Sequence, residues 1–118
     1  MYVVIRRYAA GARADEVVRR VGEGLVPILT KTSGFRAYYC FVGEDGRPVS
    51  VSIVDSRAAA VVANERAREW VGANMADLLP DPPEVTMGEM LVDAATFDED
   101  DEDEPDSASE APWTDGGV

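Results

Sequence analysis

Four short segments of the chain are rich in apolar residues and have the spacing of β-strands. The first, Tyr2–Tyr8, is a β-branched and aromatic run. In Phe35–Val42, Pro48–Val54 and Glu84–Val92 the side chains alternate with a period of two. The alternation in the third strand indicates one buried face and one face that is wet or lightly packed. Gly43–Gly46 contains an Asp-Gly pair, which predicts a hairpin between the second and third strands.

Two segments between the strands have the period of an α-helix. The first opens at Asp15, where a negative charge suits the helix dipole, and we expect it to loosen near Pro27 and to end before Gly34. One face of it contains Val17, Val18, Val21, Leu25 and Ile28. The second helix, Arg57–Ala73, follows a capping residue at Ser56. One face of it contains Ala59, Val62, Ala63, Arg66 and Trp70.

The predicted order of elements is β-α-β-β-α-β, the ferredoxin-like arrangement of the α+β class. Such a chain forms a four-stranded antiparallel sheet with two helices on one face. The other sheet face then carries apolar side chains on several strands and has no helix to cover it. An apolar face of this kind indicates a partner, and a second copy related by a two-fold axis is the simplest one. We therefore predict a homodimer that forms an α/β barrel.

The charge of the chain is concentrated at its C-terminal end. Residues 93–118 contain 11 of the 23 acidic residues and no Lys or Arg, whereas the whole chain carries a net charge of −12. We predict a folded domain over residues 1–92 and a disordered acidic tail over residues 93–118. The tail would repel phosphate, so we predict no nucleic-acid partner. It could dock on a protein partner with a basic surface, and Trp113 is the residue that favours docking over a purely solubilising role.

The inventory of reactive side chains excludes several kinds of chemistry. The chain has one cysteine, Cys40, and no histidine, so an intrachain disulfide, a multi-cysteine metal site and the commonest general base are absent. Without a histidine to activate it, Cys40 is interpreted as a buried structural thiol. We predict no cofactor and no metal. The sequence shows no signal peptide and no apolar stretch long enough to span a membrane, which predicts a cytoplasmic protein with no membrane partner.

Four segments give the chain a resemblance to a known family. They are Ser33–Tyr39, Val49–Arg57, Asn64–Val71 and Pro83–Glu89. Residues 1–92 resemble the dimeric α/β-barrel proteins of the antibiotic-biosynthesis-monooxygenase-like superfamily. The resemblance implies that two sheets form a barrel between subunits and that a pocket lies between each sheet and its own helices.

The resemblance also implies a choice of activities. Members of the superfamily include cofactor-independent oxygenases of polyketide aromatics, haem-degrading enzymes and domains with no known reaction. The haem-degrading members use an Asn, a Trp and a His, and the absence of histidine excludes that branch. In the oxygenases an Asn and a Trp lie on or near the second helix, as Asn64 and Trp70 do here. Six residues separate these two, which places them about 120° apart around the helix axis.

Five residues are candidates for a ligand pocket, each with a structural alternative. Asn64 and Trp70 could position an aromatic substrate, or be a solvated helix residue and a core anchor. Tyr38 and Tyr39 point to opposite faces of their strand, so one of them could offer a phenol to a ligand on the helix side. Met87 could line a soft apolar pocket or belong to the core.

Arginines provide a second set of candidates. Arg6, Arg7 and Arg36 could bind an anionic ligand, but Arg6 and Arg7 face opposite sides of the sheet, so at most one enters a given cavity. The alternative is an ion pair across the sheet with Glu84 or Glu89.

The function expected from the sequence is that of a small dimeric domain that binds a partner or a small apolar ligand, without a catalytic constellation. One alternative is a cofactor-independent monooxygenase acting on an aromatic, polyketide-like substrate. A second alternative is an interaction protein whose acidic tail docks on a basic surface.

Overall fold

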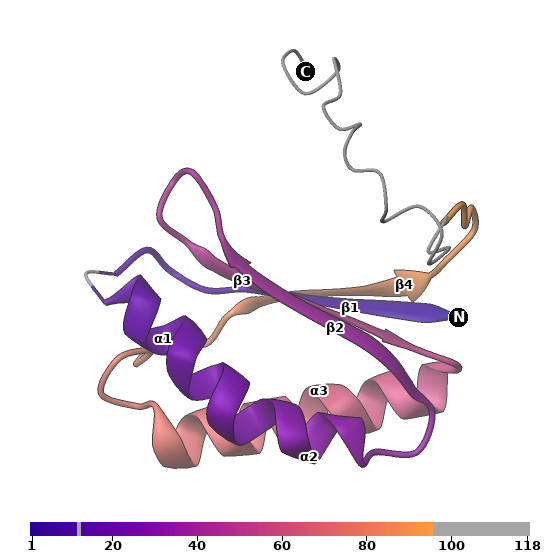
Figure 1. Cartoon of the computed structure of the whole chain (residues 1–118), viewed down its shortest axis with the longest axis horizontal. Coiled ribbons are helices and arrows are strands. Elements are labelled where there is room, and N and C mark those ends of the chain that lie inside the picture. The colour runs from indigo at the N-terminus through magenta and orange to yellow at the C-terminus, as the bar shows by residue number, and fades with distance from the viewer. Residues whose placement is uncertain (12, 96–118) are drawn as a thin grey trace, which may run out of the picture.

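One antiparallel sheet with helices on a single side forms the body of the protein (Figure 1). The structure is a computed structural model and describes residues 1–11 and 13–95. The elements are β1 (Tyr2–Arg7), α1 (Ala14–Arg20), η1 (Val21–Leu25), α2 (Val26–Thr30), β2 (Phe35–Val42), β3 (Pro48–Val54), α3 (Arg57–Asn74) and β4 (Glu84–Glu89). The strand order is β2-β3-β1-β4. This confirms the α+β, ferredoxin-like fold expected from the sequence.

The register of the strands decides which side chains face the helices. Val4 of β1 lies opposite Ser52 of β3 and Met87 of β4, so these three side chains share one face. The predicted hairpin between β2 and β3 is present, and Gly46 supplies the positive φ, +85°, that its turn requires. β4 ends at Glu89, three residues before the predicted end, although the N–H of Met90 still donates to the carbonyl of Met1 at 2.8 Å.

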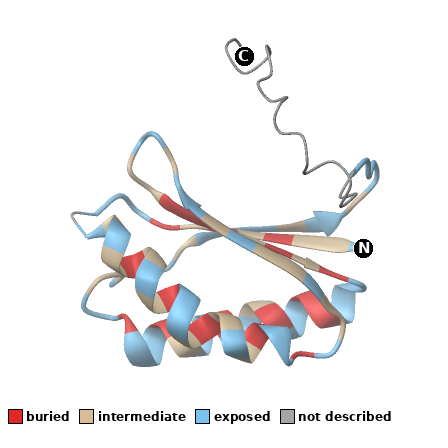
Figure 2. Cartoon of the chain, in the orientation of Figure 1, coloured by how far each residue is buried: buried red, intermediate tan, exposed pale blue. Residues whose placement is uncertain are grey.

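The helix-facing core depends on a stripe of small residues along α3. Its buried residues are Ala59, Ala60, Ala63, Ala67 and Val71 (Figure 2). The sequence pattern placed Val62 on the buried face, but Val62 is 41% exposed. The alanines bring the axis of α3 close to the sheet, and the bulk of the core comes instead from residues on other elements, such as Leu29, Val54 and Met75.

The helical run between β1 and β2 is interrupted by one wide turn. Residues Val21–Leu25 are π-helical, and the N–H of Val26 donates to the carbonyl of Val21, five residues earlier. This loosening lies before Pro27 rather than at it. Proline lacks an N–H and crowds the carbonyl four residues before it, so a wider turn upstream relieves both problems. Gly24 also lies in this turn, directly against the ring of Trp70.

Several sequence expectations fall outside the described residues. They concern residues 96–118, which make up most of the predicted acidic tail and include Trp113. In the part of the chain that the structure does describe, no helix is long and apolar enough to cross a membrane.

A matched pair of glycines tests the packing of Trp70. We expect Gly24→Ala to lower the free energy of unfolding by about 1–3 kcal/mol, because a Cβ there would overlap the indole ring. Gly22→Ala in the same turn meets no atom within 4 Å, so it should be neutral or stabilise by up to about 1 kcal/mol. Urea unfolding followed by circular dichroism measures both. Equal effects of the two substitutions would contradict the described contact.

Candidate functional site

The helix-facing side of the sheet is polar where a core is normally apolar. Arg6, Ser50 and Ser52 are all buried there, and Arg6 is only 3% exposed. Strand pairing places Cys40 of β2 opposite Ser50, and Tyr38 opposite Ser52. We call the group Arg6, Tyr8, Tyr38, Cys40, Ser50, Ser52 and Asn64 the polar cluster. A buried cluster of this kind costs folding free energy unless its members bind one another or a ligand.

Arg6 is the centre of the polar cluster. Its Nε donates a hydrogen bond of 3.0 Å to the hydroxyl of Tyr8, which follows β1 on the same face. Its Nη1 donates a hydrogen bond of 2.5 Å to Oδ1 of Asn64 on α3. The guanidinium also lies over the Tyr8 ring, 5.5 Å from the ring centroid. These contacts join a strand and a helix that are 58 residues apart in the sequence.

No carboxylate balances this charge among the residues that the structure describes. Their ion pairs include Arg47 with Glu84 at 3.4 Å, but none involves Arg6. The cross-sheet pair of Arg6 with Glu84 or Glu89, which the sequence left open, is therefore not formed. A guanidinium stays protonated in proteins and has five N–H donors. Two of these donors form the hydrogen bonds to Tyr8 and Asn64.

The other titratable members of the polar cluster are neutral at physiological pH. Burial raises the pKa of Tyr8, and Arg6 lowers it by a smaller amount. Burial also raises the pKa of Tyr38 and of the Cys40 thiol. None of the three therefore provides an anion for Arg6, and the cluster as a whole carries a positive charge. Across residues 1–11 and 13–95, no group of three His, Cys, Asp or Glu residues is arranged to hold a metal ion.

A cleft of about 250 Å³ reaches the polar cluster from one side. It is lined by Arg6, Arg68, Val71, Gly72 and residues 79–83. It therefore lies between the second half of α3 and the connection from α3 to β4. Because the Arg68 side chain is 64% exposed, Arg68 forms the rim of the cleft and Arg6 its inner wall.

The structure separates the pocket candidates into two groups. Asn64 and Tyr38 belong to the polar cluster. Trp70 lies against Gly24 and lines a different, open depression with Ile28, Arg66 and Glu69, so it does not share a cavity with Asn64. Tyr39 lies on the opposite face of the sheet and is 53% exposed. Met87 is half-buried and packs against the apolar core.

Sequence reasoning missed the role of β3 in this site. The alternation Val49-Ser50-Val51-Ser52-Ile53 indicated one buried face and one that is wet or lightly packed, without deciding which side chains lie on which face. In the structure Ser50 and Ser52 face the helices, and Val51 and Ile53 face away from them. The two-residue spacing of the serines shows that they share a face of β3. Only the strand register shows that they lie opposite Arg6 and Val4, on the face toward the helices. Arg68 at the rim of the cleft was missed as well.

The sheet order, the two covering helices and the cleft beside α3 define a ferredoxin-like domain with the fold of the antibiotic-biosynthesis-monooxygenase-like proteins. The resemblance found in the sequence is confirmed at the level of the fold. Rv0793 from Mycobacterium tuberculosis is 23% identical with a TM-score of 0.63, and the match covers 80% of this chain and 98% of that one. A Nitrosomonas europaea protein of unknown function, NE2512, is 18% identical with a TM-score of 0.65, covering 80% and 93%.

A third solved structure carries a ligand. It is the monooxygenase from the gene ActVA-Orf6 of Streptomyces coelicolor, in complex with Nanaomycin D. It is 18% identical with a TM-score of 0.65, and the match covers 80% of this chain and 91% of that one. No protein-family model and no curated protein matches the sequence. Likeness at these identities establishes a shared fold, and the activity has to be argued from the site.

Replacing Arg6 tests whether its charge stabilises the folded protein. We expect Arg6→Met to leave the free energy of unfolding unchanged or to raise it by about 1–3 kcal/mol, because it removes a buried charge that has no described counter-ion. Urea denaturation provides the measurement. Arg47→Met is the control, since Arg47 pairs with Glu84 and donates to the Tyr8 carbonyl at 2.8 Å. A loss of more than about 2 kcal/mol in Arg6→Met would show that the guanidinium is a structural element.

Proposed function

We propose that this chain is a homodimeric domain that binds a small, partly apolar molecule in the cleft beside α3, over the polar cluster. The observation that carries the proposal is the burial of Arg6 at the inner wall of an open cleft, with N–H donors that no described residue accepts. A core built only for stability would use apolar residues at these positions. Polar groups converging on a cleft with apolar walls are instead typical of a ligand site.

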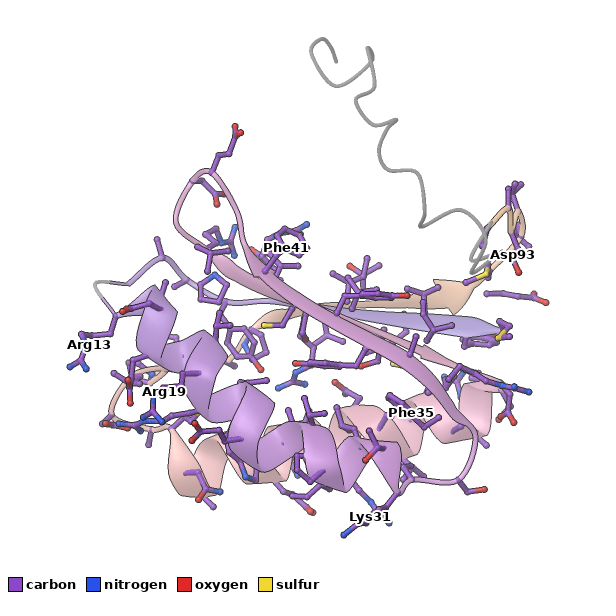
Figure 3. The ribbon with its side chains drawn as sticks, viewed as in Figure 1. Arg13, Arg19, Lys31, Phe35, Phe41 and Asp93 are labelled. Carbon is purple, nitrogen blue, oxygen red and sulfur yellow. The ribbon has the colours of Figure 1, made fainter. Side chains whose placement is uncertain are left out.

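The outer face of the sheet supports the dimer. Tyr39 and Phe41 of β2 are 53% and 50% exposed, and Phe41 lies on the side of the sheet away from the helices (Figure 3). Ile5, Val51 and Ile53 extend this apolar face across β1 and β3. A face of this kind is typical of an interface. A second copy presents the same face, so two sheets packed against each other would cover both.

Charge placed on the outer face tests the dimer. We expect the full chain to sediment as a dimer at micromolar concentration and Phe41→Lys to sediment as a monomer, because the new ammonium group would lose its hydration in the interface. The matched control is Val62→Lys. Val62 is exposed on α3, outside the proposed interface, so this variant should remain a dimer. A monomeric unsubstituted chain in analytical ultracentrifugation would refute the dimer.

A neutral aromatic probe tests ligand binding itself. We expect 2-naphthamide to bind saturably and to shift the backbone amide resonances of Asn64, Val71 and Leu79 in NMR spectra, because these residues surround the cleft or adjoin its inner wall. Residues of the hairpin turn, 43–46, provide the internal control and should not shift. Shifts confined to the outer face of the sheet, or no saturable binding, would contradict the proposed site.

A cofactor-independent monooxygenase is the second candidate. Asn64 favours it, because this side chain already accepts a hydrogen bond from Arg6 beside two phenols, which are groups that could orient an aromatic hydroxyl. The monooxygenase with the same fold, which was solved with Nanaomycin D, also supports it. Oxygen uptake with a polycyclic phenol, abolished in Asn64→Ala and retained in Asn74→Ala, would establish this activity.

Docking through the acidic tail is a separate proposal. Its support is the charge of residues 93–118 and the presence of Trp113. Loss of salt-sensitive binding to a basic protein after removal of these residues would support it, and unchanged binding would refute it.

A further inference from the structure

We infer that the ligand of this cleft is a small aromatic monocarboxylate, whose carboxylate binds the guanidinium of Arg6. This inference rests on the proposed ligand-binding function and specifies its substrate class. It goes beyond that function because the shape of the cleft alone would admit a neutral molecule equally well.

The need for an anion follows from the surroundings of Arg6. Arg6 is 3% exposed as a whole residue, so its guanidinium has lost most of its hydration. Tyr8 and Asn64 accept two of its N–H groups, but both are neutral acceptors. A carboxylate supplies the missing negative charge, and its two oxygens match the planar donors of a guanidinium.

The other members of the polar cluster do not supply that charge. Tyr8, Tyr38 and Cys40 all have a pKa raised by burial, so they remain protonated. Ser50 and Ser52 are uncharged. Within the described part of the chain, the polar cluster therefore lacks a negative charge that a bound carboxylate would bring.

The walls of the cleft indicate the rest of the ligand. Val71, Leu79 and Pro82 provide apolar surface between the rim and Arg6. The volume, about 250 Å³, lies just below the range of roughly 300–1,000 Å³ for drug-sized ligands, which favours one or two rings. Arg68 at the rim attracts an anion, although Glu65 already pairs with it. Asp81 also lines the cleft, and its charge disfavours a second carboxylate on the ligand.

Two probes of the same shape test the inference. The probes are 2-naphthoate and its neutral counterpart 2-naphthamide, measured by isothermal titration calorimetry with the full chain. We expect the carboxylate to bind at least tenfold more tightly. In Arg6→Gln the preference should disappear, because the carboxylate loses more affinity than the neutral amide does. The matched control is Arg7→Gln, the neighbouring arginine on the opposite face of β1, which should preserve the preference.

The possible outcomes separate this inference from the function on which it rests. If neither probe binds saturably, the proposed ligand site fails. If both bind with equal affinity, or if Arg6→Gln keeps the preference, the site stands and the carboxylate inference is overturned.

A measurement on the unsubstituted chain remains decisive if Arg6→Gln does not fold. The Nε–Hε resonance of Arg6 should shift on addition of 2-naphthoate and stay in place with 2-naphthamide. A resonance that is insensitive to 2-naphthoate at saturation would overturn the inference.

Discussion

The burial of the Arg6 guanidinium is the constraint that the inner face of the sheet has to satisfy. A charge buried on the inner face of a sheet has to be surrounded by polar partners, because desolvation without them is costly. Two of these partners accept hydrogen bonds from it: Tyr8, which follows β1, and Asn64 of α3. Ser50 of β3 lies opposite Arg6 in the strand register. The alanine stripe of α3 contributes to this arrangement, because only small residues let the helix come close enough to the sheet for Asn64 to reach it. The cleft beside α3 then leaves one route open to the charged group.

The two faces of the sheet have different proposed roles. The inner face combines an apolar core around Leu29, Val54 and Met75 with the polar cluster. The outer face exposes Tyr39 and Phe41, and none of the helices in residues 1–11 and 13–95 covers it. A domain of this size buries a limited fraction of its surface, so a partner on the outer face would add the burial that the polar inner face does not provide. The proposed dimer and the proposed ligand site are thus linked, because the interface would stabilise a fold whose inner face is partly polar.

Most of the fold was predictable from the sequence, and about half of the site. The bounds predicted for β2 and β3 agree with the structure, and α3 extends one residue beyond its predicted end. Arg6 was recognised as a candidate for anion binding, and Asn64 and Tyr38 as pocket residues, although nothing in the sequence placed the three together. The resemblance brought Trp70 and Asn64 together as candidates, whereas in the structure Trp70 packs against Gly24 and lines a different depression. The predicted face of α3 contained Ala59 and Ala63 correctly, but it continued through Val62, Arg66 and Trp70, whereas the buried face continues through Ala60, Ala67 and Val71.

The sequence by itself determined the order of elements, the hairpin turn at Gly46 and the presence of an apolar strand face, because periodicity, turn chemistry and composition are local properties. It also excluded chemistry that needs histidine. Only the tertiary structure decided that Ser50 and Ser52 point inward, that Arg6 meets Asn64 rather than a glutamate, and that a cleft reaches this charge from the edge of α3. These features depend on strand register and on the distance between helix and sheet. Both are set by packing among segments far apart in the chain, and a shift of one residue in register would reverse every one of these side chains.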